Sequence, residues 1–174
     1  MNLNPALCLL ALAIFAGPAA AQMDHGEHSG PAMNFLRVDD SLATGGHLVG
    51  QGLAELEADG VTLIVDLRDD PPVGYAKDVQ KLGLEYVNIP VSWRSPQLDD
   101  FEKFRATMNA NPDANVLVQC QANYRASAFT YLYRVLELGV PEAKARADMN
   151  RIWEPEGTWA DYIEAVTEKS GAKR

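Results

Sequence analysis

Apolar positions along this chain form short continuous runs that alternate with helical repeats. The run at 61–65, Val-Thr-Leu-Ile-Val, has no polar alternation, which is typical of a strand covered on both faces of a sheet. Strands are predicted at 35–38, 61–65, 84–91 and 116–119. Helices are predicted from about 48 to Gly60, over 75–82, from Pro96 past Met108, from Ala126 to Gly139, over 142–150, and around Tyr162 and Val166.

The order of these elements indicates the fold class. Strands and helices alternate along most of the chain, which predicts a three-layer α/β domain with a central, mainly parallel sheet of four or five strands. Residues 44–47, Thr-Gly-Gly-His, are predicted to form a turn. Ser95 is predicted to cap a helix that begins at Pro96. Cys120 would then lie at the C-terminal end of a central strand, where open α/β sheets bind ligands.

The N-terminal segment has the pattern of a secretory signal peptide. A short apolar block at 7–16 is followed by Gly-Pro and then three alanines, so cleavage is expected before Gln22. No Lys or Arg precedes the block, and the alternative is a retained anchor, although the block is too short to span a membrane. We expect a signal peptide at 1–21, a flexible linker at 22–33, one domain at 34–168 and a tail at 169–174. The mature protein would be periplasmic or secreted, without stable membrane insertion.

After that cleavage, which would also remove Cys8, the mature chain would contain one cysteine. It could form no internal disulfide in an oxidising compartment. Retaining an oxidisable thiol there is easier to explain if the thiol performs chemistry.

Cys120 stands between a predicted strand and a predicted helix. A loop at this place can direct several backbone N–H groups at one point, with the positive end of the helix macrodipole behind them. Such a site favours thiolate over thiol, so Cys120 is the candidate nucleophile. Arg125 can grip a tetrahedral oxyanion with two N–H donors, and Asn123 tolerates the positive φ that tight loops often require. The alternative is a cysteine that only packs beneath a helix.

A cysteine loop with an arginine between strand and helix resembles the signature loop of the cysteine-dependent protein phosphatases, most closely the bacterial tyrosine and dual-specificity type. The resemblance extends from 34 to about 166, through 43–46, 65–68 and 88–91. It implies hydrolysis of phosphomonoesters, phosphotyrosine among them, through a cysteinyl-phosphate and without metal or cofactor. It also implies roles for the loop: attack by Cys120, binding of the phosphoryl oxygens by Arg125 and by loop positions Gln121, Ala122, Asn123, Tyr124 and Ala126, and help from Ser127 in breaking down the intermediate.

The loop departs from the family pattern in two ways. Gln119 replaces the usual histidine before the cysteine, and four residues instead of five separate Cys120 from Arg125. Either the loop is one residue shorter, or the arginine has moved back by one and Ala126 occupies its usual place. A six-residue cysteine loop is also used by rhodanese-type sulfurtransferases, so a Cys120 persulfide carrier is a second hypothesis. A non-catalytic binder of phosphate or sulfate ligands is the third.

The general acid is a further open point. In the phosphatases that the chain resembles, a mobile loop supplies an aspartic acid, but Ser92 occupies the corresponding position here. Asp100 and Asp99 are the nearest candidates, although the first turn of a helix also favours carboxylates for electrostatic reasons. Geometry has to decide between these roles.

Three more side chains are candidates for substrate contact: Arg68, Trp93 and Glu154. For Arg68, an ion pair with Asp66 or Asp69 is the alternative. Trp153 and Trp159 either wall the cleft or pack the last helix onto the core.

A net charge of −9 excludes a basic nucleic-acid-binding face and disfavours polyanionic substrates. Small or singly charged phosphate esters, free or carried on a protein, are therefore the expected partners. His25 and His28 could hold a metal loosely, but a solvated polar tail is the alternative, since a defined site needs fixed geometry. No metal or cofactor is predicted.

Overall fold

A five-stranded sheet divides the molecule, which is represented by a computed structural model that describes residues 30–171. The strands are β1 (Leu36–Asp39), β2 (Leu42–Gly45), β3 (Leu63–Asp66), β4 (Glu85–Asn88) and β5 (Val116–Gln119). Their order across the sheet is β1-β2-β5-β3-β4. β1 is antiparallel to β2, and the other neighbours are parallel. The mainly parallel sheet is confirmed, and β5 is its central strand.

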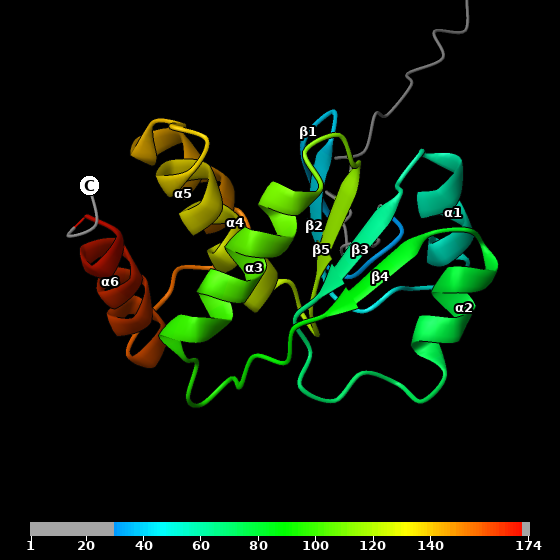
Figure 1. Cartoon of the computed structure of the whole chain (residues 1–174), viewed down its shortest axis with the longest axis horizontal. Helices are drawn as coiled ribbons and strands as arrows, with labels where there is room; N and C mark the ends of the chain where they lie inside the picture. The colour runs from blue at the N-terminus through cyan, green and yellow to red at the C-terminus, as the bar shows by residue number, and fades with distance from the viewer. Residues whose placement is uncertain (1–29, 172–174) are drawn as a thin grey trace, which may run out of the picture.

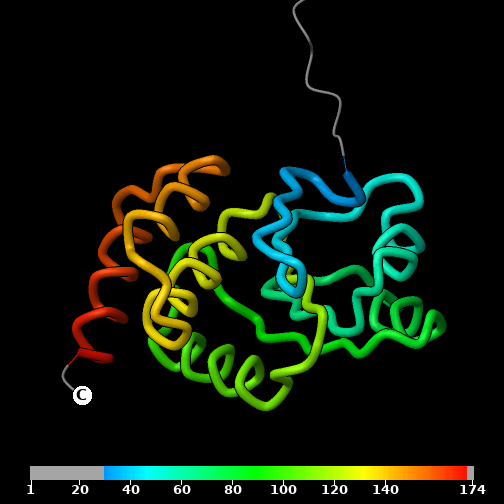
Figure 2. The backbone as a smooth tube through the Cα atoms, turned by 90° about the horizontal axis from the view of Figure 1, so that it is seen from above, coloured from blue at the N-terminus to red at the C-terminus, as the bar shows by residue number. Residues whose placement is uncertain are grey.

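Helices cover both faces of this sheet. They are α1 (Gly52–Ala58), α2 (Tyr75–Lys81), α3 (Leu98–Ala110), α4 (Tyr124–Leu136), α5 (Glu142–Asn150) and α6 (Thr158–Gly171). Figure 1 shows α1 and α2 on one side of the strands and α3 and α4 on the other, with α5 and α6 farther out. The view from above in Figure 2 shows the same two groups of helices on opposite sides of the sheet. The predicted three-layer α/β fold is confirmed, with α5 and α6 packed outside α4.

The two faces of the sheet explain the unbroken apolar runs in the sequence. Ile64 and Leu117 pack into the cluster beneath α1 and α2. Their neighbours Val65 and Val118 face the opposite cluster, which includes Phe129 of α4. Because both faces are covered, neither β3 nor β5 has a solvent-facing side that would require polar alternation.

One strand was not predicted. Residues 44 and 45 were expected in a turn, but they belong to β2, which pairs with β5 from Leu42 opposite Val116 to Gly45 opposite Gln119. Gly45 and Gly46 do not form a turn; they allow neighbouring segments to pack closely against the backbone. A Cβ on Gly46 would lie 2.8 Å from the Gln121 carbonyl oxygen, so only glycine lets β2 come this near to the cysteine loop.

The predicted start of the third helix was also wrong. Helix α3 begins at Leu98, with Gln97 as its N-cap. The Gln97 backbone N–H donates to the Asp100 carboxylate at 2.9 Å, which satisfies a donor that the helix itself cannot pair. Ser95 does not cap the helix; its hydroxyl oxygen lies 3.0 Å from Gln97 Nε2, which donates to it.

The domain extends beyond the boundaries expected from sequence. Ala32, assigned to the linker, is buried, and the Met33 N–H donates to the His47 carbonyl at 3.0 Å. Helix α6 continues to Gly171, through part of the expected tail. The predicted signal peptide and the pair His25 and His28 lie outside the described residues. Within 30–171, no helix combines the length and hydropathy needed to cross a membrane.

Candidate active site

Cys120 lies directly after β5, at the sheet edge where the parallel strands end. Its backbone N–H donates to the Gly45 carbonyl at 3.0 Å, which fixes the residue against β2. Only 1% of Cys120 is exposed, yet the residue lines a cavity of 390 Å³. The other lining residues are Trp93, Gln121, Ala122, Tyr124 and Arg125. The structure therefore brings six of the predicted site residues together around the thiol.

Asn123 shapes the loop between Cys120 and α4. It has φ 68° and is the N-cap of the helix, so the helix begins immediately behind the cysteine loop. The backbone N–H groups of Tyr124, Arg125 and Ala126 lie in the first turn, where a helix offers them no acceptor. Unpaired N–H groups and the positive end of the helix macrodipole are the features that favour an anion at such a place.

A pair of asparagines holds this loop against the N-terminal segment. Asn123 Nδ2 donates to the Asn34 carbonyl at 2.6 Å and to Thr44 Oγ1 at 2.9 Å. In return, Asn34 Nδ2 donates to the Ala122 carbonyl at 3.1 Å. Asn123 is fully buried and is not among the residues that line the cavity, so its side chain supports the loop. The role of Asn34 was missed because the pair is 89 positions apart and no local pattern indicates it.

Arg125 is held by two groups from different loops. Its Nη1 donates to the Val91 carbonyl at 2.6 Å and to Asp69 Oδ1 at 2.9 Å. The hydrogen bond from Arg125 lowers the pKa of the Asp69 carboxyl group, so this carboxylate is ionised at neutral pH. Asp69 was considered from the sequence only as a partner of Arg68. Its contact with Arg125 depends on the fold that brings the ends of β3 and β5 together.

Arg68 does not serve as a second anion-binding arginine. It is buried, and its Nε and Nη2 grip both oxygens of Asp66, the shortest of these contacts being 2.6 Å from Nη2 to Oδ2. Its backbone N–H also donates to the same carboxylate. The alternative interpretation, an ion pair that fixes the loop after β3, is the one that the geometry shows.

Gln119 occupies the position of the family histidine and is completely buried. Its Oε1 accepts from the Tyr75 hydroxyl at 2.6 Å, and its Nε2 donates to the Gly46 carbonyl at 3.2 Å. Burial raises the pKa of Tyr75 to about 12, so the phenol stays protonated and can donate at neutral pH. Gln119, the residue before the nucleophile, is thus bound to α2 through Tyr75 and to the end of β2 through Gly46.

Aromatic rings form one wall of the site. Tyr124 and Trp93 line the cavity. Trp153 stacks on Tyr124 with ring centroids 4.9 Å apart, and Trp159 stacks on Trp93 at 5.2 Å. Trp159 Nε1 also donates to the Trp93 carbonyl at 3.0 Å. Trp93 is held by this packing although 42% of it is exposed. Trp153 and Trp159 do not line the cavity; they pack against the core cluster and support the ring of Trp93.

Besides Arg68 and Asn123, four more predicted residues are placed away from the cavity lining. The Ser127 hydroxyl donates to the Tyr124 carbonyl at 3.0 Å and accepts from Trp153 Nε1 at 3.1 Å. The Ala126 side chain is buried in the core cluster, which leaves its backbone N–H as the only group that could meet a ligand. The Asp100 carboxylate caps α3, as described above. Glu154 is exposed and does not line the cavity.

A second cavity, of 380 Å³, lies between α4, α5 and α6, and its lining includes Tyr131 and Ile163. It contains no cysteine, so the chemistry points to the cavity at Cys120. Within the residues that the structure describes, no group of three or more His, Cys, Asp or Glu side chains could hold a metal ion.

Comparison with solved structures shows where this fold recurs. A DUF442 protein from Shewanella putrefaciens CN-32, named as a proposed phosphatase, is 30% identical with a TM-score of 0.70, and the match covers 80% of this chain and 94% of that one. The chain belongs to the cysteine-dependent, protein-tyrosine-phosphatase-like family. No family model matches this member of the phosphatase family, and no curated protein matches it in sequence.

More distant members of the phosphatase family share the fold. A mouse protein named as a proposed dual specificity phosphatase, solved with zinc tungstate, is 21% identical over 87% of this chain and 96% of that one, with a TM-score of 0.68. TpbA from P. aeruginosa is 18% identical over 80% and 90% of the two chains, with a TM-score of 0.65. At these identities the likeness shows a shared fold.

Proposed function

We propose that this protein hydrolyses aryl phosphomonoesters, of which phosphotyrosine is one, through a cysteinyl-phosphate intermediate. The single observation that carries the proposal is the cavity in which the Cys120 thiol, the Arg125 guanidinium and the first turn of α4 meet. Those are a nucleophile, a fork for phosphoryl oxygens and a set of unpaired N–H donors, which together suffice for phosphoryl transfer.

Another arginine of the same molecule shows how the Arg125 guanidinium could bind two oxygens. Arg68 uses Nε and Nη2 to grip both oxygens of Asp66. Arg125 uses only Nη1 for its contacts with Val91 and Asp69. Its Nε and Nη2 edge has no acceptor among the described residues, and that edge can take two oxygens of a phosphoryl group in the same bidentate way.

The reaction would proceed in two steps. The Cys120 thiolate attacks phosphorus, an S–P bond forms and the P–O bond to the leaving group breaks, with the electron pair leaving on oxygen. Water then attacks phosphorus, the S–P bond breaks, and phosphate leaves while the thiolate is restored. Arg125 and the N–H groups at the start of α4 stabilise the oxygens in both steps.

The cavity favours an aromatic leaving group for two reasons. Within the described part of the chain, the residues that line it include no carboxylate that could protonate the leaving oxygen. A phenoxide leaves more readily than an alkoxide without such help, because a phenol ionises near pH ~10. Trp93 and Tyr124 also offer ring faces on which an aryl group can stack. The substrate is therefore a small aryl phosphate or one displayed on a protein.

A comparison of three substrates tests the proposal. Wild type is expected to hydrolyse phenyl phosphate, to hydrolyse glycerol phosphate at least ~100-fold more slowly, and to show no thiocyanate formation from thiosulfate and cyanide. Cys120→Ser should lose all turnover but still bind tungstate, while Lys77→Ala, at an exposed position of α2, serves as a surface control with wild-type rates. Rapid quenching during turnover should trap a phosphorylated protein in wild type only.

Other outcomes would select the other hypotheses. Thiocyanate formation that depends on Cys120 would replace hydrolysis by sulfur transfer. Tungstate binding without either reaction would indicate a non-catalytic binder of phosphate or sulfate ligands.

We also propose that the protein is exported, on the apolar block at 7–16 and the small residues ahead of Gln22. The intact mass of protein purified from the expressing cells should correspond to a chain that begins at Gln22. A mass that retains residues 1–21 would contradict export by cleavage.

A further inference from the structure

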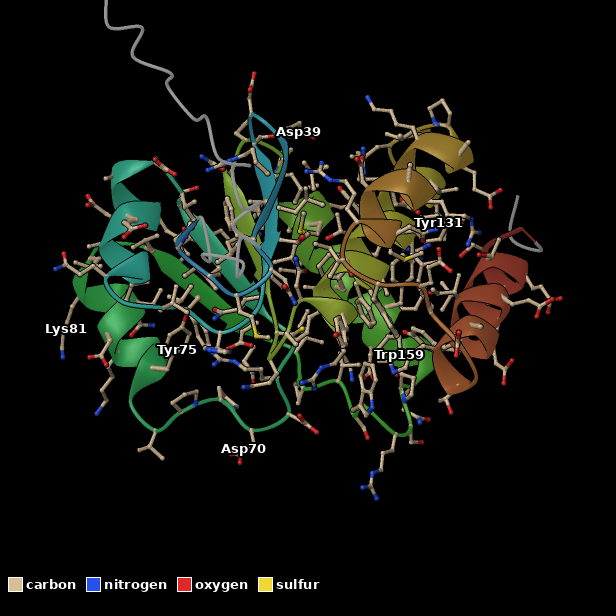
Figure 3. All side chains as sticks on the ribbon, turned by 180° about the vertical axis from the view of Figure 1, so that it is seen from behind. Asp39, Asp70, Tyr75, Lys81, Tyr131 and Trp159 are labelled. Carbon is tan, nitrogen blue, oxygen red and sulfur yellow. The ribbon has the colours of Figure 1, made fainter. Side chains whose placement is uncertain are left out.

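Two aspartates follow Arg68 on the loop after β3, and they differ in their surroundings. Asp69 accepts a hydrogen bond from Arg125 Nη1 at 2.9 Å, although 54% of its side chain is exposed. Asp70 is exposed, and Figure 3 shows it at the edge of the molecule with its side chain pointing outward. An exposed carboxylate is seldom held in one place by a surface ion pair alone. The contact with Arg125 therefore needs an explanation from its surroundings.

The loop that carries Asp69 is built to hold it in place. Beside it, Arg68 and Asp66 form a buried bidentate pair. The Asn88 side chain adds two hydrogen bonds of 2.9 Å, to the Asp66 and Arg68 carbonyls. The Tyr86 hydroxyl donates to Asp66 at 2.9 Å. These contacts fix the backbone immediately before Asp69 and so fix the carboxylate relative to Arg125.

The position of the arginine makes this support necessary. Arg125 belongs to the first turn of α4, and four residues instead of the family's five separate it from the cysteine. A flexible arginine side chain has many rotamers, and all but one must be excluded before its guanidinium has a fixed orientation. Asp69 and the Val91 carbonyl accept both N–H groups of Nη1, which leaves the Nε and Nη2 edge for a ligand.

We propose that Asp69 is a positioning residue, which holds the Arg125 guanidinium so that its free edge faces the phosphoryl group above Cys120. This inference rests on the proposed function of the site. Asp69 acts through the arginine and takes no part in bond formation. Its carboxylate also opposes an incoming anion by charge, so the proposal requires that the gain from orientation exceeds this repulsion.

Three variants separate orientation from charge. Asp69→Ala removes both the acceptor and the charge. Asp69→Asn removes the charge, while its amide oxygen can still accept from Arg125 Nη1. Asp70→Ala removes a neighbouring charge with no contact to Arg125 and is the matched control. Each is combined with wild-type Cys120 for kinetics and with Cys120→Ser for tungstate binding by titration calorimetry.

Asp69→Ala is expected to weaken tungstate binding and to lower kcat/KM for phenyl phosphate by about tenfold each, the size of one charge-assisted hydrogen bond. Asp69→Asn should stay within about threefold of wild type in both measurements, because the acceptor is kept. Asp70→Ala should match wild type. Thermal melting of each variant checks that the fold is intact.

Tungstate binding by Asp69→Ala that is unchanged or tighter would overturn the inference, since it would show that charge repulsion dominates. An equal loss in Asp69→Asn and Asp69→Ala would also overturn it, because the charge and not the contact would then matter. Failure of the proposed function is a different result: no turnover by wild type. In that case weaker tungstate binding by Asp69→Ala alone still supports the positioning role.

Discussion

Asn123 meets two requirements: a backbone with positive φ and a side chain that donates hydrogen bonds. Substitution by glycine and by alanine separates the two. Its φ of 68° disfavours any side chain with a Cβ, at a cost of about 1–2 kcal/mol. Its Nδ2 binds Asn34 and Thr44, at about 1 kcal/mol for each hydrogen bond. Asn123→Ala loses these bonds and gains nothing in backbone freedom, so we expect a destabilisation of roughly 2–4 kcal/mol. Asn123→Gly relieves the backbone and should cost about half as much.

Urea unfolding measures both changes. The exposed Asn150, at the end of α5, provides a control, and Asn150→Ala should stay within about 0.5 kcal/mol of wild type. If Asn123→Gly proved as destabilised as Asn123→Ala, backbone conformation would not contribute at this position and the prediction would be wrong.

At the scale of residues, the sequence predicted the groups that share one short segment. Cys120, Asn123 and Arg125 lie within six positions, and the strand and helix around them show where each must lie. Asp69 and Asn34 could not be predicted, because their contacts with the loop depend on which strands are neighbours in the sheet. The buried role of Gln119 was missed for the same reason, since its partner Tyr75 lies 44 positions away.

Helix α3 provides a test at the scale of an element, because its N-terminus holds a candidate general acid in a capping position. The Asp100 carboxylate accepts from the Gln97 N–H, so Asp100→Ala should destabilise the protein by about 1 kcal/mol. Asp99→Ala, which changes the exposed neighbour in the same first turn, should cost less. Neither change should lower kcat for phenyl phosphate more than about twofold, as checked by steady-state kinetics on folded protein. A loss of kcat in Asp100→Ala without loss of stability would restore the general-acid hypothesis.

The elements themselves were predicted where hydrophobic periodicity is strong. The runs that became β3 and β5 and the repeats that became α2 and α5 lie close to their expected positions. Strand β2 was not predicted because it ends in Thr-Gly and a second glycine follows, a local pattern that is also typical of a turn. Its strand conformation depends on pairing with β5 on one side and β1 on the other. The start of α3 was predicted two residues too early, because a serine followed by a proline is a common helix start. The helix begins at Leu98, where the Asp100 carboxylate accepts from the Gln97 N–H.

For the whole molecule, alternation of strands and helices predicted a parallel sheet but not the order of its strands. That order places β5 between β2 and β3. It therefore brings segments after three strands to the cysteine loop and to Arg125: Gly46 after β2 lies beside Ala122, and Asp69 after β3 and Val91 beyond β4 bind Arg125. The site is a product of this topology, and the parts supplied by other strands became visible only with the fold.

Buried phenols make the stability of the whole domain sensitive to alkaline pH. Burial raises the pKa of Tyr75 to about 12 and raises the pKa values of Tyr86 and Tyr162 as well, whereas an unfolded tyrosine ionises near pH ~10. Above that pH the unfolded chain releases phenolic protons that the folded chain retains, so stability falls as pH rises. For Tyr75 the fall is at most about 1.4 kcal/mol per pH unit, and it ends above the folded pKa.

Urea unfolding between roughly pH 8 and 11 should therefore show a steady midpoint at first and then a falling one. Tyrosinate absorbance should rise together with the loss of the circular-dichroism signal, because these phenols ionise when the domain opens. Tyr75→Phe should start from a lower midpoint, having lost its hydrogen bond to Gln119, but should show a shallower fall, since one protected phenol is gone. Tyrosinate signals from all six tyrosines near pH ~10 in a domain with unchanged circular dichroism would contradict the prediction. They would place these phenols in contact with water and not in the packed interior.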